Sequence, residues 1–126
     1  MKKIIASDQA PAAIGPYAQA VDCGSFVITS GQIGMDPATG KLVPGGVQEQ
    51  TRQALTNLTH VLEAAGLSMD NVVKTTVFLK DIGDFAAMNE VYATFFKAGQ
   101  YPARSAFQVG ALPAGALVEI ETICVK

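Results

Sequence analysis

Arg104 is the residue of this chain best suited to binding an anion. It stands in the hexapeptide at positions 101–106, at the start of a strand-like and otherwise apolar segment. Only nine of the 126 residues are Lys or Arg, so a cation among apolar neighbours needs a physical reason. A guanidinium is always charged and can hold a carboxylate or phosphate in a bidentate pair. Two interpretations are open: a structural ion pair with an acid such as Glu119 or Glu121, or a clamp for a small anionic substrate.

Two carboxylates near the C-terminus form the second candidate group. Strand alternation puts Glu119 and Glu121 on one face together with the large apolar residues Leu117, Ile123 and Val125. Burying a carboxylate without a partner is costly, so each one should pair with a cation or border a wet cleft. Either both pair with Arg or Lys across the sheet or a subunit boundary, or one acts as a general base or water-orienting group beside Arg104.

Other catalytic machinery is sparse in the sequence. His60 is the single histidine, and helical phase points it away from an apolar stripe and toward solvent. With one histidine and two distant cysteines, Cys23 and Cys124, no metal cluster has plausible spacing. The segment 30–34 contains glycine but lacks the GxGxxG spacing and a following helix, so a dinucleotide fold is not expected.

The composition indicates one domain over residues 1–126 that assembles with copies of itself. Charged residues make up 16% of the chain, below the usual ~25%, so part of the surface is expected to be buried in a homo-oligomer. A net charge of −2 without a basic run argues against nucleic-acid binding. No apolar stretch is long enough for a membrane span or a signal peptide, and the cysteines show no pairing pattern, so we expect a reduced, cytoplasmic protein.

Hydrophobic periodicity predicts an α+β fold in the order β-β-β-α-β-α-β-β. The two helices are predicted at residues 47–65 and 85–98, and residues 31–46, rich in Gly and Pro, are predicted to be mostly loop. Strands are predicted at 3–5, 17–21, 25–30, 72–80, 104–109 and 116–125. Both helices should cover one face of a mixed sheet, which leaves the other face for subunit contacts.

Several short motifs, in order along the chain, resemble the RidA (YjgF) family. Each motif is weak alone, but together they cover essentially the whole chain and are highly specific. They are the segments at residues 13–17 (AIGPY), 29–32 (TSGQ), 89–92 (NEVY) with 95–96 (FF), 102–105 (PARS) and 119–121 (EIE).

This resemblance implies a chorismate-mutase-like α+β fold with a mixed six-stranded sheet, two helices on one face, and a homotrimer built around a central barrel. It implies hydrolysis of reactive enamine and imine intermediates, such as 2-aminoacrylate/2-iminopropanoate and 2-iminobutanoate, to 2-oxo acids and ammonia. Such an enzyme uses no cofactor and no metal, and its three clefts lie between subunits.

The resemblance also implies roles for particular residues. Arg104 would bind the substrate carboxylate, and Glu119 would position or activate water. The remaining cleft residues would be Tyr17, Ser30, Gly31, Phe85 and Asn89, with backbone groups near Ala106 contacting the imine side of the substrate.

One position departs from the family pattern. Relatives often carry a cysteine where this chain has Ala106, so a thiol cannot be the nucleophile there and direct attack by water is favoured. Cys23 and Cys124 do not stand at that position and are interpreted as small, buried or half-buried hydrophobic residues. Two other functions stay open: a small-carboxylate-binding regulatory or chaperone-like protein without catalysis, and, less favoured on the acidic composition, an endoribonuclease.

Overall fold

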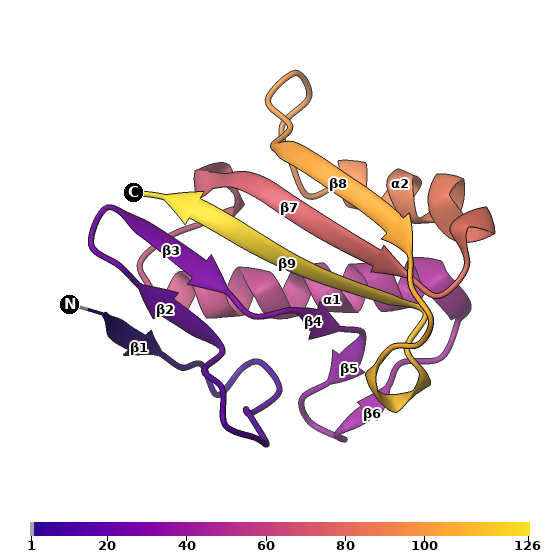
Figure 1. The fold of residues 1–126 in the computed structure, drawn as a ribbon, viewed down its shortest axis with the longest axis horizontal. Coiled ribbons are helices and arrows are strands. Elements are labelled where there is room, and N and C mark those ends of the chain that lie inside the picture. Colours follow the sequence, from indigo (N-terminus) through magenta and orange to yellow (C-terminus); the bar gives the residue numbers. More distant parts are fainter. Residues whose placement is uncertain (1) are drawn as a thin grey trace.

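The computed structural model describes residues 2–126 and contains one main mixed sheet with two helices behind it (Figure 1). The strands of the sheet follow the order β1-β2-β3-β9-β7-β8, and β4 pairs additionally with β9. Only the β7–β8 pair is parallel; the other pairs are antiparallel. The seven strands are β1 (Lys3–Ile5), β2 (Ala20–Asp22), β3 (Phe26–Thr29), β4 (Gln32–Ile33), β7 (Val72–Leu79), β8 (Ala103–Gln108) and β9 (Val118–Val125).

The predicted α+β class, with a mixed sheet and both helices on one face, is confirmed, but the sheet has seven strands rather than six. The extra strand comes from the segment predicted as loop. This segment contains β4 and a separate two-stranded ribbon, β5 (Met35–Asp36) with β6 (Lys41–Leu42). These strands have two residues each, too short to show an alternating pattern in the sequence.

The first helix, α1 (Gly46–Ala64), builds most of the core. Its buried residues Leu55, Leu58 and Leu62 are 0% exposed and pack against the inner side of the sheet. The chain that precedes α1 lies very close to this helix at Gly34, because a Cβ on Gly34 would lie 2.5 Å from the Cα of Gln50. The Gln50 side chain accepts a hydrogen bond of 2.8 Å from the backbone N–H of Leu117, which ties the helix to the loop that leads into β9.

The second helix, α2 (Phe85–Ala93), is shorter than predicted and ends before residue 98. The Thr94 hydroxyl donates to the carbonyl of Val91 at 2.6 Å, and the N–H groups of Phe95 and Phe96 donate to carbonyls three residues back. This tightening ends the α-helical ladder. Short 3₁₀ turns at Met69–Asn71, Ile82–Asp84 and Pro113–Gly115 complete the connections.

The strand predicted at 17–21 begins only at Ala20, because the residues before it belong to a side-chain-bonded loop. The Ser30 hydroxyl donates to the Ala18 carbonyl at 2.6 Å, and the buried amide of Gln19 makes three hydrogen bonds. Two of these bonds go to the backbone of Ser7 and one to the carbonyl of Pro11. The local backbone is therefore fixed by side chains instead of a strand partner.

Alternation along β9 divides its side chains as the sequence predicts. Val118, Ile120 and Cys124 are 0% exposed under the helices, while Glu119 and Glu121 lie half-buried on the opposite, open face of the sheet. This open face also carries large apolar side chains that are between 37% and 45% exposed. We refer to them as the open-face patch: Phe26, Ile28, Phe107, Ile123 and Val125.

Candidate active site

Arg104 lies on the helix-covered side of β8, in a cradle formed by one face of α2. Its guanidinium carbon is 5.1 Å from the centroid of the Phe85 ring and 4.9 Å from that of Tyr92. Its Nη1 donates a hydrogen bond of 2.7 Å to Oδ1 of Asn89. These three side chains recur at helical spacing i, i+4 and i+7, so all of them face β8 together.

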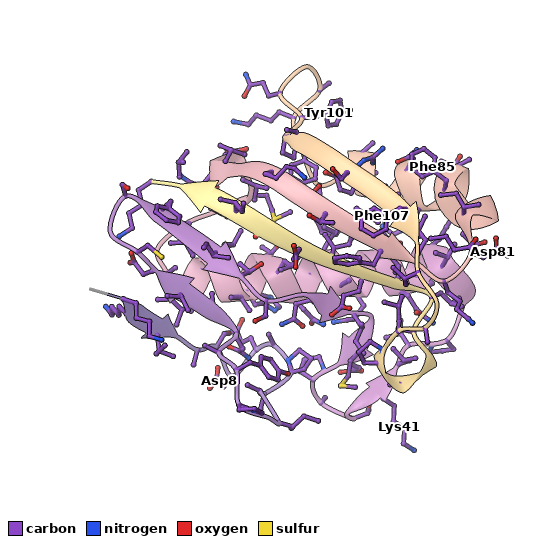
Figure 2. All side chains as sticks on the ribbon, in the orientation of Figure 1. Asp8, Lys41, Asp81, Phe85, Tyr101 and Phe107 are labelled. Carbon is purple, nitrogen blue, oxygen red and sulfur yellow. The ribbon has the colours of Figure 1, made fainter. Side chains whose placement is uncertain are left out.

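Arg104 has no carboxylate partner among residues 2–126. The ion pairs within this part of the chain join Arg52 to Glu49, Lys97 to Asp70 and Lys126 to Asp22. The interpretation of Arg104 as half of an ion pair with Glu119 or Glu121 of the same chain is therefore wrong. Its guanidinium borders a pocket of about 400 Å³ that is also lined by Asn89, Tyr92, Ala93, Tyr101 and Pro102. Tyr101, labelled in Figure 2, lies on the loop between α2 and β8.

Glu119 occupies a second pocket, of about 490 Å³. Gly31 permits this placement, because a Cβ at residue 31 would lie 2.8 Å from both Cδ and Cγ of Glu119 and would overlap its Oε2 atom. The pocket brings together four of the residues predicted from the family motifs: Tyr17, Ser30, Gly31 and Glu119. Its other walls are mostly apolar and come from Pro11, Ala12, Ile14, Ile33, Met35, Pro113 and Ala114, with Gln32 as the one further polar residue.

The loop that carries Tyr17 is shaped by the hydrogen bonds of Ser30 and Gln19 described above. Because the Ser30 hydroxyl gives its proton to the Ala18 carbonyl, its oxygen keeps lone pairs that can accept a hydrogen bond. Tyr17 is 52% exposed, so its ring borders solvent as well as the pocket. This wall therefore offers a hydroxyl acceptor and an aromatic surface.

Glu119 is poised to accept a proton. Burial raises its pKa above the ordinary value of 4.5, and the negative charge of Glu121 raises it further. A carboxylate with a raised pKa binds a proton more readily near neutral pH than an exposed one does. No ion pair neutralises either carboxylate within residues 2–126.

The two pockets lie on opposite sides of the sheet. Arg104 pairs in register with Thr75, which is 0% exposed beneath the helices. Glu119 pairs in register with Phe78 on the same strand, β7, and faces the open side. Residues opposite each other on paired strands share a face, and Thr75 and Phe78, three positions apart, face opposite ways. Within one chain the sheet therefore separates Arg104 from Glu119.

Ala106 also lies on the helix-covered side of β8, two residues beyond Arg104, and packs against the core. Within residues 2–126 β8 pairs only with β7, so it forms one edge of the sheet. Backbone groups along this edge can therefore reach a bound molecule or a partner.

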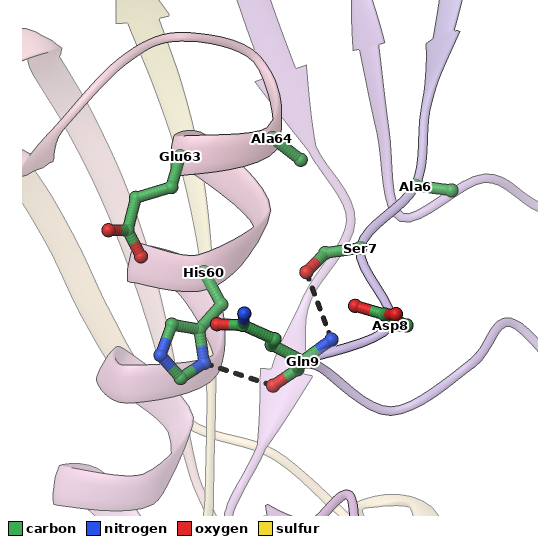
Figure 3. Close-up of a pocket in the computed structure, with 7 residues that line it drawn as sticks. All are labelled: Ala6, Ser7, Asp8, Gln9, His60, Glu63 and Ala64. Atoms are coloured by element: carbon green, nitrogen blue, oxygen red, sulfur yellow. Dashed lines mark hydrogen bonds between the residues drawn. The ribbon is translucent and has the colours of Figure 1, made fainter.

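His60 is half-buried rather than simply solvated. It lies near the C-terminal end of α1 and lines a third pocket, of about 770 Å³ (Figure 3). Its Nδ1 atom is 2.9 Å from the Gln9 carbonyl, and Asp8 and Glu63 line the same pocket. No group of His, Cys, Asp and Glu within residues 2–126 has the geometry to hold a metal ion.

Both cysteines have free thiols, as expected. Cys124 is buried with its sulfur 3.6 Å from the Thr122 hydroxyl, and burial raises the pKa of this thiol. A protonated, enclosed thiol is a poor nucleophile. The interpretation of Cys124 as a small buried side chain is confirmed, and Cys23 is half-buried.

Sequence reasoning missed three residues around Arg104. In the sequence, Tyr92 belongs to the family motif at 89–92 without a role at the site, Thr75 to a predicted strand, and Tyr101 to the hexapeptide that contains Arg104. The spacing of Tyr92, seven residues after Phe85, could have placed it beside the arginine. The Tyr92–Thr75 contact depends on strand pairing, which no local pattern contains.

Substitution of Gly31 tests whether its missing Cβ holds Glu119 in place. In Gly31→Ala we expect the new methyl group to push the Glu119 carboxylate toward solvent and to lower its pKa toward 4.5, since burial is the main cause of the raised value. The carboxyl carbon of Glu119 can be titrated by NMR. Gly110→Ala, with no atom within 4 Å of the added Cβ, is the matched control. An unchanged titration in Gly31→Ala contradicts this role.

Substitution of Glu121 tests how much its negative charge contributes to the raised pKa of Glu119. Glu121→Gln removes a like charge, so the pKa of Glu119 should fall while remaining raised by burial. A carboxyl with a raised pKa in the folded state stabilises the fold when protonated, and this gain is lost as pH rises through its folded pKa. The increase in melting temperature on acidification through that range should therefore be smaller in Glu121→Gln. An identical Glu119 titration in both proteins would show that Glu121 has no influence.

Comparisons with known proteins agree with this fold over the whole chain. Residues 7–126 match the protein family described as Endoribonuclease L-PSP. A mouse protein named 2-iminobutanoate/2-iminopropanoate deaminase is 55% identical over 126 residues, which are 100% of this chain and 93% of the relative. No helix within residues 2–126 combines the length and apolar character needed to cross a membrane.

Solved structures show the same arrangement of elements. The E. coli YjgF gene product has a TM-score of 0.93 and 50% identity, covering 98% of each chain. E. coli TdcF, solved with bound serine, has a TM-score of 0.93 and 51% identity, again covering 98% of each chain. With family, sequence and fold in agreement over nearly every residue, this chain belongs to the Endoribonuclease L-PSP family, which includes the RidA and YjgF proteins that its motifs resemble.

Proposed function

We propose that this protein is a deaminase that hydrolyses 2-iminobutanoate and 2-iminopropanoate, the tautomer of 2-aminoacrylate, to 2-oxo acids and ammonia. The observation that carries this proposal is an oriented guanidinium, that of Arg104, which borders a pocket without a carboxylate partner from residues 2–126. The name of the mouse relative supports it, and so does the serine bound to TdcF, a small amino acid with a free carboxylate.

Arg104 binds the substrate carboxylate in this proposal. Asn89 occupies one hydrogen-bonding position on Nη1, which leaves other N–H groups of the guanidinium for the two oxygens of a carboxylate. A charge-assisted contact of this kind contributes about 1.5–3 kcal/mol. Phe85 and Asn89 hold the guanidinium, and Asn89 also lines its pocket.

Glu119 activates water for attack on the imine carbon. The water oxygen bonds to that carbon, the electron pair of the C=N bond moves to nitrogen, and Glu119 takes the proton from water. Glu119 then returns this proton to nitrogen, which gives a carbinolamine with one hydroxyl and one amino group. Glu119 next takes the hydroxyl proton and passes it to the amino nitrogen, so that the C–N bond breaks as the C=O bond forms and ammonia leaves. The sum is imine plus water giving 2-oxo acid plus ammonia, without a cofactor or metal. Orientation supplies much of the advantage, because the imine is already electrophilic.

Water is the nucleophile rather than a protein thiol. The position two residues after Arg104 carries a methyl group, and the enclosed Cys124 lies on β9 under the helices. Tyr17, Ser30 and Gly31 form the wall around the water and the imine, while the apolar walls of the same pocket suit a short aliphatic side chain.

The working site requires two copies of the chain, and we propose a homotrimer with clefts between its subunits. Arg104 of one subunit and Glu119 of the next would act on one substrate, since a single chain holds them on opposite sides of its sheet. The exposed open-face patch and the low charged fraction of 16% support burial of that face between copies. Each subunit is one RidA-like domain over residues 1–126, and the free thiols fit a cytoplasmic location.

The family description names an endoribonuclease, but the charges of this chain favour a small substrate. The net charge is −2, and the single histidine lies in a pocket with Asp8 and Glu63, which would repel a phosphate backbone. A regulatory protein that binds a small carboxylate without catalysis would use the same arginine. Measurement of turnover separates that possibility from the deaminase.

Replacement of Arg104 tests the proposal. In Arg104→Ala, kcat/KM for imine hydrolysis should fall by about 10- to 100-fold, the equivalent of the lost charge-assisted contact. The imine is generated by a serine or threonine dehydratase, and 2-oxo acid formation is followed in single-turnover reactions. Arg52→Ala, which removes an exposed arginine from α1, is the matched control. Hydrolysis at the wild-type rate in Arg104→Ala contradicts the clamp, and binding of 2-oxobutanoate by wild type without hydrolysis supports the regulatory function.

A further inference from the structure

The orientation of Arg104 depends on a chain of contacts that passes through two buried residues outside the predicted site. A free arginine side chain has many rotamers, and fixing one of them costs conformational entropy. Asn89 fixes one end of the guanidinium, while the rings of Phe85 and Tyr92 lie at 5.1 and 4.9 Å from its carbon. The π-electrons of both rings attract the guanidinium cation.

Tyr92 is itself held more firmly than Phe85. It is 5% exposed, and its hydroxyl shares a hydrogen bond of 2.7 Å with the hydroxyl of Thr75. The Phe96 ring packs on the same side chain, with its centroid 4.9 Å from that of Tyr92. Burial raises the pKa of Tyr92, so its hydroxyl keeps its proton and the hydrogen bond persists over the neutral pH range.

Thr75 closes the chain of contacts back to Arg104. It is 0% exposed on β7 and is the register partner of Arg104 on β8. Strand pairing therefore places the backbone of Arg104 beside Thr75. The guanidinium of Arg104 contacts the ring of Tyr92, whose hydroxyl is hydrogen-bonded to Thr75. Three contacts thus connect these residues: Arg104 on β8 pairs with Thr75 on β7, Thr75 bonds to Tyr92 on α2, and Tyr92 contacts the guanidinium of Arg104.

We propose that Tyr92, held by Thr75, is a positioning residue that fixes the guanidinium of Arg104 for carboxylate binding. The inference rests on the proposed function, since it assigns a purpose to the orientation of the carboxylate-binding group. Tyr92 lines the pocket of Arg104, and Thr75 does not. The contact between their hydroxyls acts on the carboxylate through Arg104, so its loss should weaken carboxylate binding more than it affects the chemical step.

The hydroxyl contact can be tested with Thr75→Val, Tyr92→Phe and the double variant. Calorimetry gives the affinity for 2-oxobutanoate, and kinetics give KM and kcat for imine hydrolysis. We expect each single variant to raise Kd and KM about three- to tenfold with a smaller change in kcat, as loss of one hydrogen bond predicts. The double variant should be no worse than the single variants, because both remove the same contact.

Thr51→Val is the matched control. Thr51 is also 0% exposed, but its hydroxyl donates to the Val47 carbonyl within α1 and has no link to Arg104. This variant should lose stability in the same way as Thr75→Val and keep the wild-type Kd. The comparison separates positioning of the arginine from a general loss of stability.

A larger change at Tyr92 tests the ring itself. Tyr92→Leu removes the aromatic face as well as the hydroxyl and should weaken 2-oxobutanoate binding by about tenfold or more, a larger loss than in Tyr92→Phe, which keeps the ring. If Tyr92→Leu does not fold, the Thr75→Val and Tyr92→Phe pair still decides the question. Wild-type Kd and KM in that pair, or strictly additive effects in the double variant, overturn the inference. Loss of binding in Arg104→Ala alongside wild-type binding in these variants would leave the proposed function intact, whereas unchanged binding in Arg104→Ala would contradict the function itself.

Discussion

The alternation of side chains across one sheet controls the chemistry available to this protein. Arg104 on β8 faces the helices, where aromatic rings and an amide can hold a cation without neutralising it. Glu119 on β9 faces the open side, where partial burial and Glu121 raise its pKa. Since the sheet lies between them, attraction between the two groups cannot quench either one within a chain. Within residues 2–126 both charged groups therefore stay without an ion-pair partner.

Neighbouring residues fix the position of Glu119 on one side of the sheet and of Arg104 on the other. Gly31 leaves space that the Glu119 carboxylate occupies, and Ser30 and Gln19 fix the neighbouring loop through side-chain hydrogen bonds. On the other side of the sheet, α2 supplies the cradle of Arg104 from a single helical face. A charge held in a fixed orientation before substrate arrives loses little free energy when it binds. The supporting residues thus help to keep both charged groups oriented.

Local patterns in the sequence predict the larger elements, whereas the grouping of Tyr17, Ser30, Gly31 and Glu119 in one pocket follows only from the family motifs. The helical periodicity of α1 and the alternation of β9 identify the side of each element that faces the core. In long amphipathic segments the apolar residues recur several times at the same spacing, which makes the buried side recognisable. The end of α2 was missed, since turn bonds around Thr94 compete with the helix. The contact between Tyr92 and Thr75 joins residues 17 positions apart through strand and helix packing, which periodicity cannot reveal. The separation of Arg104 from Glu119 likewise became visible only with the strand register.

The central claim is that one catalytic cleft takes Arg104 from one subunit and Glu119 from another, and mixing of subunits tests it most directly. Arg104→Ala and Glu119→Gln chains, each nearly inactive alone, are unfolded and refolded together to form mixed assemblies. Random mixing at equal amounts should restore about one quarter of the clefts, because those clefts receive both intact residues. Imine hydrolysis by the mixture should then rise well above that of either variant. Activity that stays at the mean of the two separate variants would contradict the account.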